Sequence, residues 1–66
     1  MEPRYPDVTV ELINQDGNAF AIMGAVTRQL RRAGVDKAEI DKYTAEATAG
    51  DYNHLLRVTM DWVEVE

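Results

Sequence analysis

The sequence predicts an α+β fold in the order strand, helix, helix, helix and short strand, with a two-stranded sheet covered by the helices. Three observations lead to this prediction. Residues 7–14 alternate apolar and polar side chains, as a half-buried strand does. Residues that cap or end helices recur along the chain between Asn18 and Asp51. The last residues alternate valine and glutamate, so the tail of the chain can pair with the first strand.

The longest helix is expected over residues 18–33. Asn18 suits its start, because the side-chain oxygen can accept a hydrogen bond from an unpaired amide of the first turn. Gly34 suits its end, because glycine readily adopts the left-handed conformation that closes a helix. Apolar residues recur between these ends with the 3.6-residue period and form one face. They are Ala19, Ile22, Met23, Val26, Leu30 and Ala33.

The second helix is expected over residues 36–49. Asp36 and Glu39 form a pair similar to a capping box, in which each side chain accepts from the other residue's backbone amide. Gly50 is expected to close this helix in the left-handed conformation, as Gly34 closes the first.

The third segment begins at Asp51, a good N-cap. Two periods compete over residues 58–66, because the apolar positions fit both a helix and an alternating strand. We expect the helix to run from Tyr52 to about residue 61. A short strand through Val63 and Val65 then follows.

Sixty-six residues make one small domain, predicted over residues 1–66. A chain of this length buries only about 60% of the surface that it exposes when unfolded, so its stability is marginal. Each predicted element contributes one apolar face to a shared core. The predicted core consists of Val8, Val10, Leu12, Ile22, Met23, Val26, Leu30, Ile40, Leu55, Leu56 and Met60.

The composition limits the cellular compartment and the kinds of partner that we expect. The sequence has no cysteine, no apolar run of the roughly 20 residues that a membrane helix needs, and no signal peptide. We therefore expect a cytoplasmic protein without a membrane contact. The net charge is −5, with only residues 28–42 mildly basic, at five bases against three acids. Such a balance is not the electrostatic footprint of a protein that binds nucleic acid, so we do not expect a nucleic-acid partner.

The residues needed for catalysis are largely missing. There is no serine or cysteine, and no threonine is N-terminal, so the usual nucleophiles are absent. Asp51 and His54 have a spacing that could share a metal ion, but one histidine with scattered carboxylates does not make a zinc site. The glycines form no phosphate-binding pattern. We expect no enzyme, no catalytic residue, no cofactor and no metal, with His54 at the surface beside the cap.

The first half of the long helix has almost no polar side, which suggests that it is covered on more than one side. The candidate interaction surface consists of Phe20, Gly24, Arg28, Arg31 and Arg32. Gly24 would let another backbone approach, whereas the alternative reading is that it avoids a clash within a small core. We predict a homodimer with Phe20 and Gly24 at the contact and the arginines outside it, unless the third helix covers this face.

Several short stretches together resemble a known group of sequences. They are Asp16-Gly17-Asn18-Ala19-Phe20, Leu30-Arg31-Arg32-Ala33-Gly34-Val35, Glu46-Ala47-Thr48-Ala49-Gly50-Asp51-Tyr52, His54-Leu55-Leu56 and Trp62-Val63. Over residues 5–66 the chain resembles a family of small uncharacterised proteins of bacteria, plasmids and phages. The resemblance implies no activity, cofactor or catalytic residue.

The leading hypothesis for function is a small accessory or binding protein, of a mobile element or its host, that acts through protein–protein contacts. One alternative is a DNA-binding regulator, because residues 30–35 look like the turn of a helix-turn-helix motif. The helix that follows begins with largely acidic exposed residues, which repel phosphate. A second alternative, an acidic counter-defence inhibitor that mimics DNA, rests on the charge alone.

Overall fold

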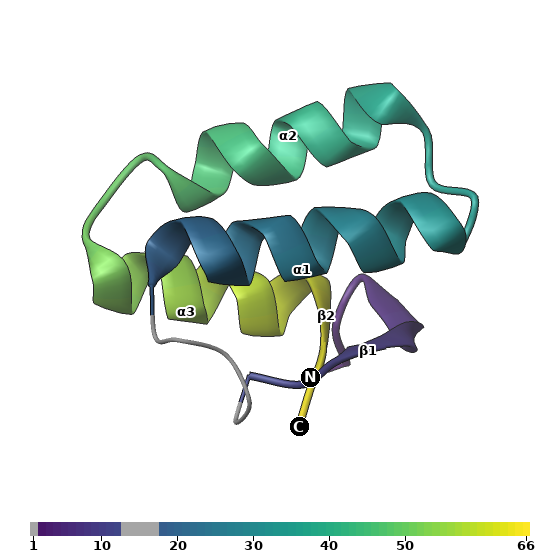
Figure 1. Ribbon diagram of the computed structural model, residues 1–66, viewed down its shortest axis with the longest axis horizontal. Helices are drawn as coiled ribbons and strands as arrows, with labels where there is room; N and C mark the ends of the chain where they lie inside the picture. Colours follow the sequence, from purple (N-terminus) through teal and green to yellow (C-terminus); the bar gives the residue numbers. More distant parts are fainter. Residues whose placement is uncertain (1, 13–17) are drawn as a thin grey trace.

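The order of elements along the chain is the predicted one, and the α+β class is confirmed (Figure 1). The computed structural model describes residues 2–12 and 18–66. The elements are β1 (Tyr5–Val10), α1 (Ala19–Arg32), α2 (Lys37–Ala47), α3 (Tyr52–Trp62) and β2 (Val63–Val65). None of these helices is long and apolar enough to cross a membrane.

The two strands form one parallel sheet, so the predicted pairing of the tail with the first strand is confirmed. Beyond the end of β2, the Glu66 amide donates to the Val10 carbonyl oxygen at 2.9 Å, and the Leu12 amide donates to the Glu66 carbonyl oxygen at 3.0 Å. Parallel strands need a crossover connection, and here the three helices provide it.

The first strand was expected over residues 7–14, but β1 begins at Tyr5 and ends at Val10. It begins earlier because Tyr5 is already paired with Val63 and because the amide of Arg4 donates to the carbonyl oxygen of Asp61 at 2.8 Å. The register shifts between Tyr5 and Thr9. Residues 13 and 14 of the predicted strand lie outside the described residues.

Both predicted ends of α1 are confirmed. The Asn18 side chain accepts from the Phe20 amide at 2.8 Å. At the other end Gly34 has a φ of +83°, its amide donates to the Arg31 carbonyl oxygen, and the Val35 amide donates to the Leu30 carbonyl oxygen. These two bonds form a Schellman motif, which satisfies carbonyl groups that the helix leaves unpaired.

The predictions for the ends of α2 are wrong in two respects. Asp36 occupies the N-cap position, but its side chain accepts no capping hydrogen bond, and the Glu39 amide donates to the Asp36 carbonyl oxygen at 3.0 Å. The Glu39 carboxylate contacts Arg4 and Tyr5. The helix ends at Ala47, and Gly50 is not left-handed, since Gly34 is the only described glycine with positive φ.

The competition between helix and strand in the last segment is resolved at Trp62, where α3 ends and β2 begins directly. Asp51 caps α3 as predicted, since its carboxylate accepts from the His54 amide at 2.9 Å. The buried face of α3 carries Leu55, Val58, Thr59 and Trp62. The inclusion of Met60 in the core was wrong, because its side chain is 56% exposed. The helix is rotated so that Val58 and Trp62 face inward in its place.

The core lies where the three helices meet the sheet. Its buried apolar residues are Val8, Val10, Ile22, Val26, Leu30, Ile40, Tyr43, Ala47, Leu55, Val58, Trp62 and Val63. Three further residues predicted for the core, Leu12, Met23 and Leu56, pack against it but are only partly buried.

One hydrogen bond between side chains lies inside this core. The Tyr43 and Thr59 hydroxyl oxygens are 2.8 Å apart, and neither residue is exposed to solvent. Burial raises the pKa of Tyr43, and the hydrogen bond with Thr59 partly offsets that rise. The bond satisfies two buried polar groups and joins α2 to α3.

Candidate functional site

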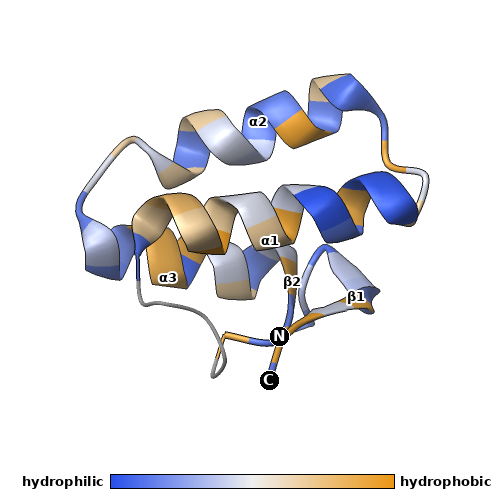
Figure 2. Cartoon of the chain, viewed as in Figure 1, coloured by the Kyte–Doolittle hydropathy of each residue, from blue (hydrophilic) through white to orange (hydrophobic). Residues whose placement is uncertain are grey.

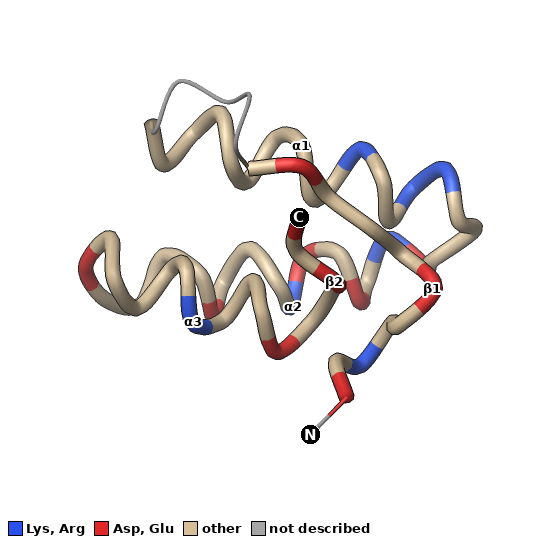
Figure 3. The backbone as a smooth tube through the Cα atoms, turned by 90° about the horizontal axis from the view of Figure 1, so that it is seen from below, with Lys and Arg blue, Asp and Glu red and all other residues tan. Residues whose placement is uncertain are grey.

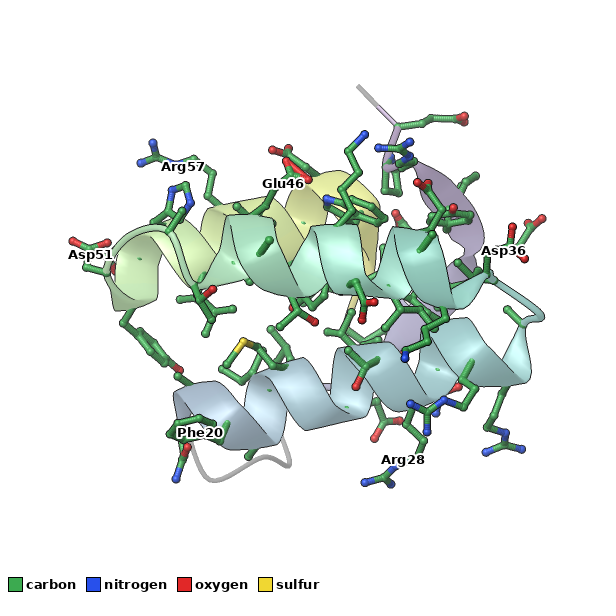
Figure 4. The ribbon with its side chains drawn as sticks, turned by 90° about the horizontal axis from the view of Figure 1, so that it is seen from above. Phe20, Arg28, Asp36, Glu46, Asp51 and Arg57 are labelled. Carbon is green, nitrogen blue, oxygen red and sulfur yellow. The ribbon has the colours of Figure 1, made fainter. Side chains whose placement is uncertain are left out.

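The five residues predicted for an interaction surface, Phe20, Gly24, Arg28, Arg31 and Arg32, are all exposed on α1. They lie on the side of the helix opposite the buried residues Ile22, Val26 and Leu30. Seen from above, Phe20 and Arg28 project from α1 on the side away from α2 (Figure 4). This outer face of α1 is therefore open to solvent.

Two observations describe the N-terminal half of this face. The Phe20 side chain is 81% exposed, so α3 does not cover it. A Cβ atom added to Gly24 would meet no described atom within 4 Å. Hence the reading in which Gly24 avoids a clash within the core is wrong, and the first half of α1 carries an uncovered apolar surface.

Phe20 borders a hollow of ≈ 260 Å³ at the end of the molecule where the start of α1, the end of α2 and the start of α3 meet. We call it the apolar hollow. Its walls include Ala19, Phe20, Met23, Ala47, Tyr52 and Leu55. Tyr52 is 41% exposed, so two aromatic side chains border the hollow and remain accessible to a partner.

The arginines belong to a different part of the surface. Two hollows of ≈ 510 Å³ and ≈ 270 Å³ lie side by side between β1 and α1, sharing Thr9 and Gln29 in their walls. Arg28 lines the larger one and Arg32 the smaller one. We call this pair of hollows the β1 groove. Figure 2 shows the same division along α1, apolar toward its start and hydrophilic toward its end.

The single histidine has a structural role that the sequence did not reveal. His54 is half-buried, and its Nε2 lies 2.8 Å from the Glu46 carbonyl oxygen, so Nε2 carries the proton, because a carbonyl group can only accept. A Cβ on Gly50 would lie 2.7 Å from the ring of His54, which explains glycine there. In the described part of the chain, no three histidine or carboxylate side chains gather as a metal site would require.

A second polar cluster joins the N-terminal segment to α2 and α3. Arg4 forms an ion pair of 2.9 Å with Glu39, and its guanidinium lies 4.6 Å from the centre of the Trp62 ring. Tyr5 donates to Glu39 at 3.0 Å and stacks on Trp62, whose ring also meets the edge of Tyr43. Burial, followed by the effects of Glu39, raises the pKa of Tyr5. Every group here has a partner within the fold, so the cluster is structural.

The charged side chains are spread over the molecule (Figure 3). Along the described backbone, acidic residues occur on the strands, on α2, on α3 and in the connections, and basic residues lie among them. The described surface thus offers an apolar hollow and a polar groove. No family model, no curated protein and no solved structure matches the chain.

Proposed function

We propose that this chain is a small cytoplasmic protein that acts by binding other proteins through the apolar hollow and the adjoining outer face of α1, without catalysis. The observation that carries the proposal is Phe20, a large apolar side chain 81% exposed beside an apolar hollow. Contiguous exposed apolar surface on a small protein usually marks a contact site, and aromatic residues are enriched at such contacts.

A second copy of the chain is the partner that we propose first. In a two-fold dimer, Phe20 of each copy would enter the apolar hollow of the other, which makes the contact self-complementary. Gly24 lies one turn further along α1 and would allow the two backbones to approach. Arg31 and Arg32 would stay outside the contact, since unpaired charges are costly to bury.

The arrangement of the helices supports protein binding over DNA binding. A helix-turn-helix motif holds its two helices at a large angle, about 90–120°. Here α1 and α2 run nearly antiparallel in two perpendicular views (Figures 1 and 4). Proteins that mimic DNA need carboxylates aligned at the spacing of phosphates, and the acidic residues of the described part of the chain are instead dispersed along the backbone (Figure 3).

Light scattering coupled to gel filtration tests the dimer at micromolar to millimolar concentration. Gly24→Leu should dissociate it by steric overlap. The same variant should leave the fold intact, or stabilise it by up to about 1 kcal/mol, because leucine suits a helix interior and the site is open. Arg31→Ala is the matched control on the same helix and should remain a dimer.

A chain that stays monomeric at the highest concentration contradicts the homodimer but leaves other protein partners to be tested. Immobilised wild-type chain and Phe20→Glu should then be compared as baits in a lysate of the source cells. A partner that the wild type retains and Phe20→Glu loses supports the proposed function. If the two baits retain the same proteins at every salt concentration, the apolar hollow is not a contact site.

A further inference from the structure

The β1 groove lies beside an open edge of the sheet. Among the described residues, β2 is the sole strand paired with β1. The Val10 carbonyl and the Leu12 amide both face the β2 side, because both bond to Glu66. Successive residues of a strand turn their backbone groups to alternate edges, so the amide and carbonyl groups of Thr9 face the other edge. Thr9 lines both hollows, so the strand borders the groove at Thr9, and the larger hollow also reaches Val10 and Glu66.

The two walls of the groove carry opposite charges. Arg28 and Arg32 stand on the α1 wall, and in the described part of the chain neither forms an ion pair. Asp7 and Glu11 stand on the strand wall, with Thr9 between them, and Glu66 lines the larger hollow as a third acid. An extended segment lying in this groove would turn alternate side chains toward α1 and toward the solvent face of β1.

The spacing of the arginines matches the repeat of a strand. Arg28 and Arg32 are four residues apart on one helix face, a rise of about 6 Å. Side chains two positions apart on a strand are separated by about 6.6 Å. Two acidic side chains at positions i and i+2 of an added strand would therefore meet the two arginines. The side chains at positions i−1 and i+3 point to the other face of the strand and would meet Asp7 and Glu11.

We propose that the open edge of β1 binds an extended segment of a partner protein by strand addition, with two acidic side chains toward Arg28 and Arg32 and basic side chains toward Asp7 and Glu11. The backbone groups of Thr9 supply main-chain hydrogen bonds, and the charges on the two walls select the sequence. This contact is separate from the apolar hollow and goes beyond the proposed function.

A second copy of β1 does not fit this edge. Two copies of β1 paired antiparallel about Thr9 would place Asp7 of each copy opposite Glu11 of the other, and like charges directly opposite are destabilising. Pro6 in the same strand also has no amide to donate. Acidic side chains and proline are the usual protection of an edge against self-pairing. The same two acids attract a strand that carries bases at those positions.

Two synthetic peptides of identical composition test the proposal. The first is acetyl-Val-Lys-Glu-Thr-Glu-Lys-Val-amide, whose pattern reads the same in both directions and so serves parallel and antiparallel addition alike. The second, acetyl-Val-Glu-Lys-Thr-Lys-Glu-Val-amide, exchanges the acids and the bases. Titration into the ¹⁵N-labelled protein, followed by amide chemical shifts, should move the Thr9 amide with the first peptide. The second peptide should bind about tenfold more weakly, since four attractive pairs become repulsive.

Variants and a modified peptide locate the contact. Arg28→Gln combined with Arg32→Gln should abolish the preference between the two peptides, and Arg31→Gln should preserve it, because Arg31 is not among the described residues that line either hollow. A peptide with N-methylated backbone amides, which cannot complete the hydrogen bonds of an added strand, should bind more weakly than its parent. Equal affinity for the two peptides, or chemical shifts confined to residues around Phe20, would overturn the proposal.

Discussion

Removal of both hydroxyls of the buried pair Tyr43 and Thr59 should cost less than the sum of the two single removals. Thr59→Val keeps the shape of the side chain but leaves the phenol of Tyr43 in the core without its 2.8 Å partner. An unsatisfied buried polar group costs about 1–3 kcal/mol. Tyr43→Phe should cost about 1 kcal/mol, because the threonine hydroxyl on a helix can turn to the carbonyl oxygen four residues earlier.

The double variant, Tyr43→Phe with Thr59→Val, removes both polar groups, so we expect it to be more stable than the sum of the single effects by about 1 kcal/mol or more. In a domain of this size each kcal/mol shifts the midpoint of thermal unfolding by roughly 4–8 °C. Urea and thermal unfolding of the four proteins, followed by circular dichroism, measure the coupling. Single effects that add within about 0.3–0.5 kcal/mol would refute the reasoning.

Three further predictions follow from single sites. The pKa of Tyr43 is raised above its ordinary value of 10.0, so stability should hold below pH 10 and fall as the pH rises through the folded-state pKa; urea midpoints against pH should show this fall, less steeply in Tyr43→Phe. Leu30→Ala should lower the free energy of unfolding by about 2–5 kcal/mol, and Met60→Ala should lower it by under about 1 kcal/mol, because Leu30 is buried and Met60 is exposed. Equal melting temperatures of the two variants would contradict this assignment of the core. Gly50→Ala should destabilise by about 1–3 kcal/mol because its Cβ would overlap the Cβ and the ring of His54; thermal unfolding should show the loss reduced but still present when His54→Ala is combined with it, since the Cβ of residue 54 remains 2.8 Å away.

The parts of the fold predicted from the sequence are those specified by neighbouring residues. Asn18 and Gly34 were assigned correctly because a cap and a Schellman motif involve only one helix end. The Glu39 half of the predicted capping box does not form, because Arg4 from the other end of the sequence pairs with the Glu39 carboxylate. No local pattern contains that contact, which depends on where the N-terminal segment lies.

The local pattern also could not predict which face of α3 is buried. Leu55, Leu56 and Met60 form a plausible apolar face, but Trp62 is fixed by contacts with residues far away in the sequence, and this turns Met60 outward. For the candidate surface, too, the local pattern predicted only the position of the residues on α1. Periodicity placed Phe20 and the arginines on one outer face of α1. It could not divide them between a hollow bordered by α3 and a groove bordered by β1, because those neighbours are set by the tertiary fold.

The parallel pairing of β1 with β2 has a consequence for the order in which the domain assembles. The sheet joins the first and the last elements of the fold, so its contacts span nearly the whole sequence. Such contacts form late in folding, since the entropy of closing the intervening chain must be lost before they stabilise anything. During synthesis α1, α2 and most of α3 emerge from the ribosome before Trp62 and Val63, both of which are buried in the finished core. The nascent helices therefore expose core surface until the last residues of the domain are released, and only then can the fold become cooperative.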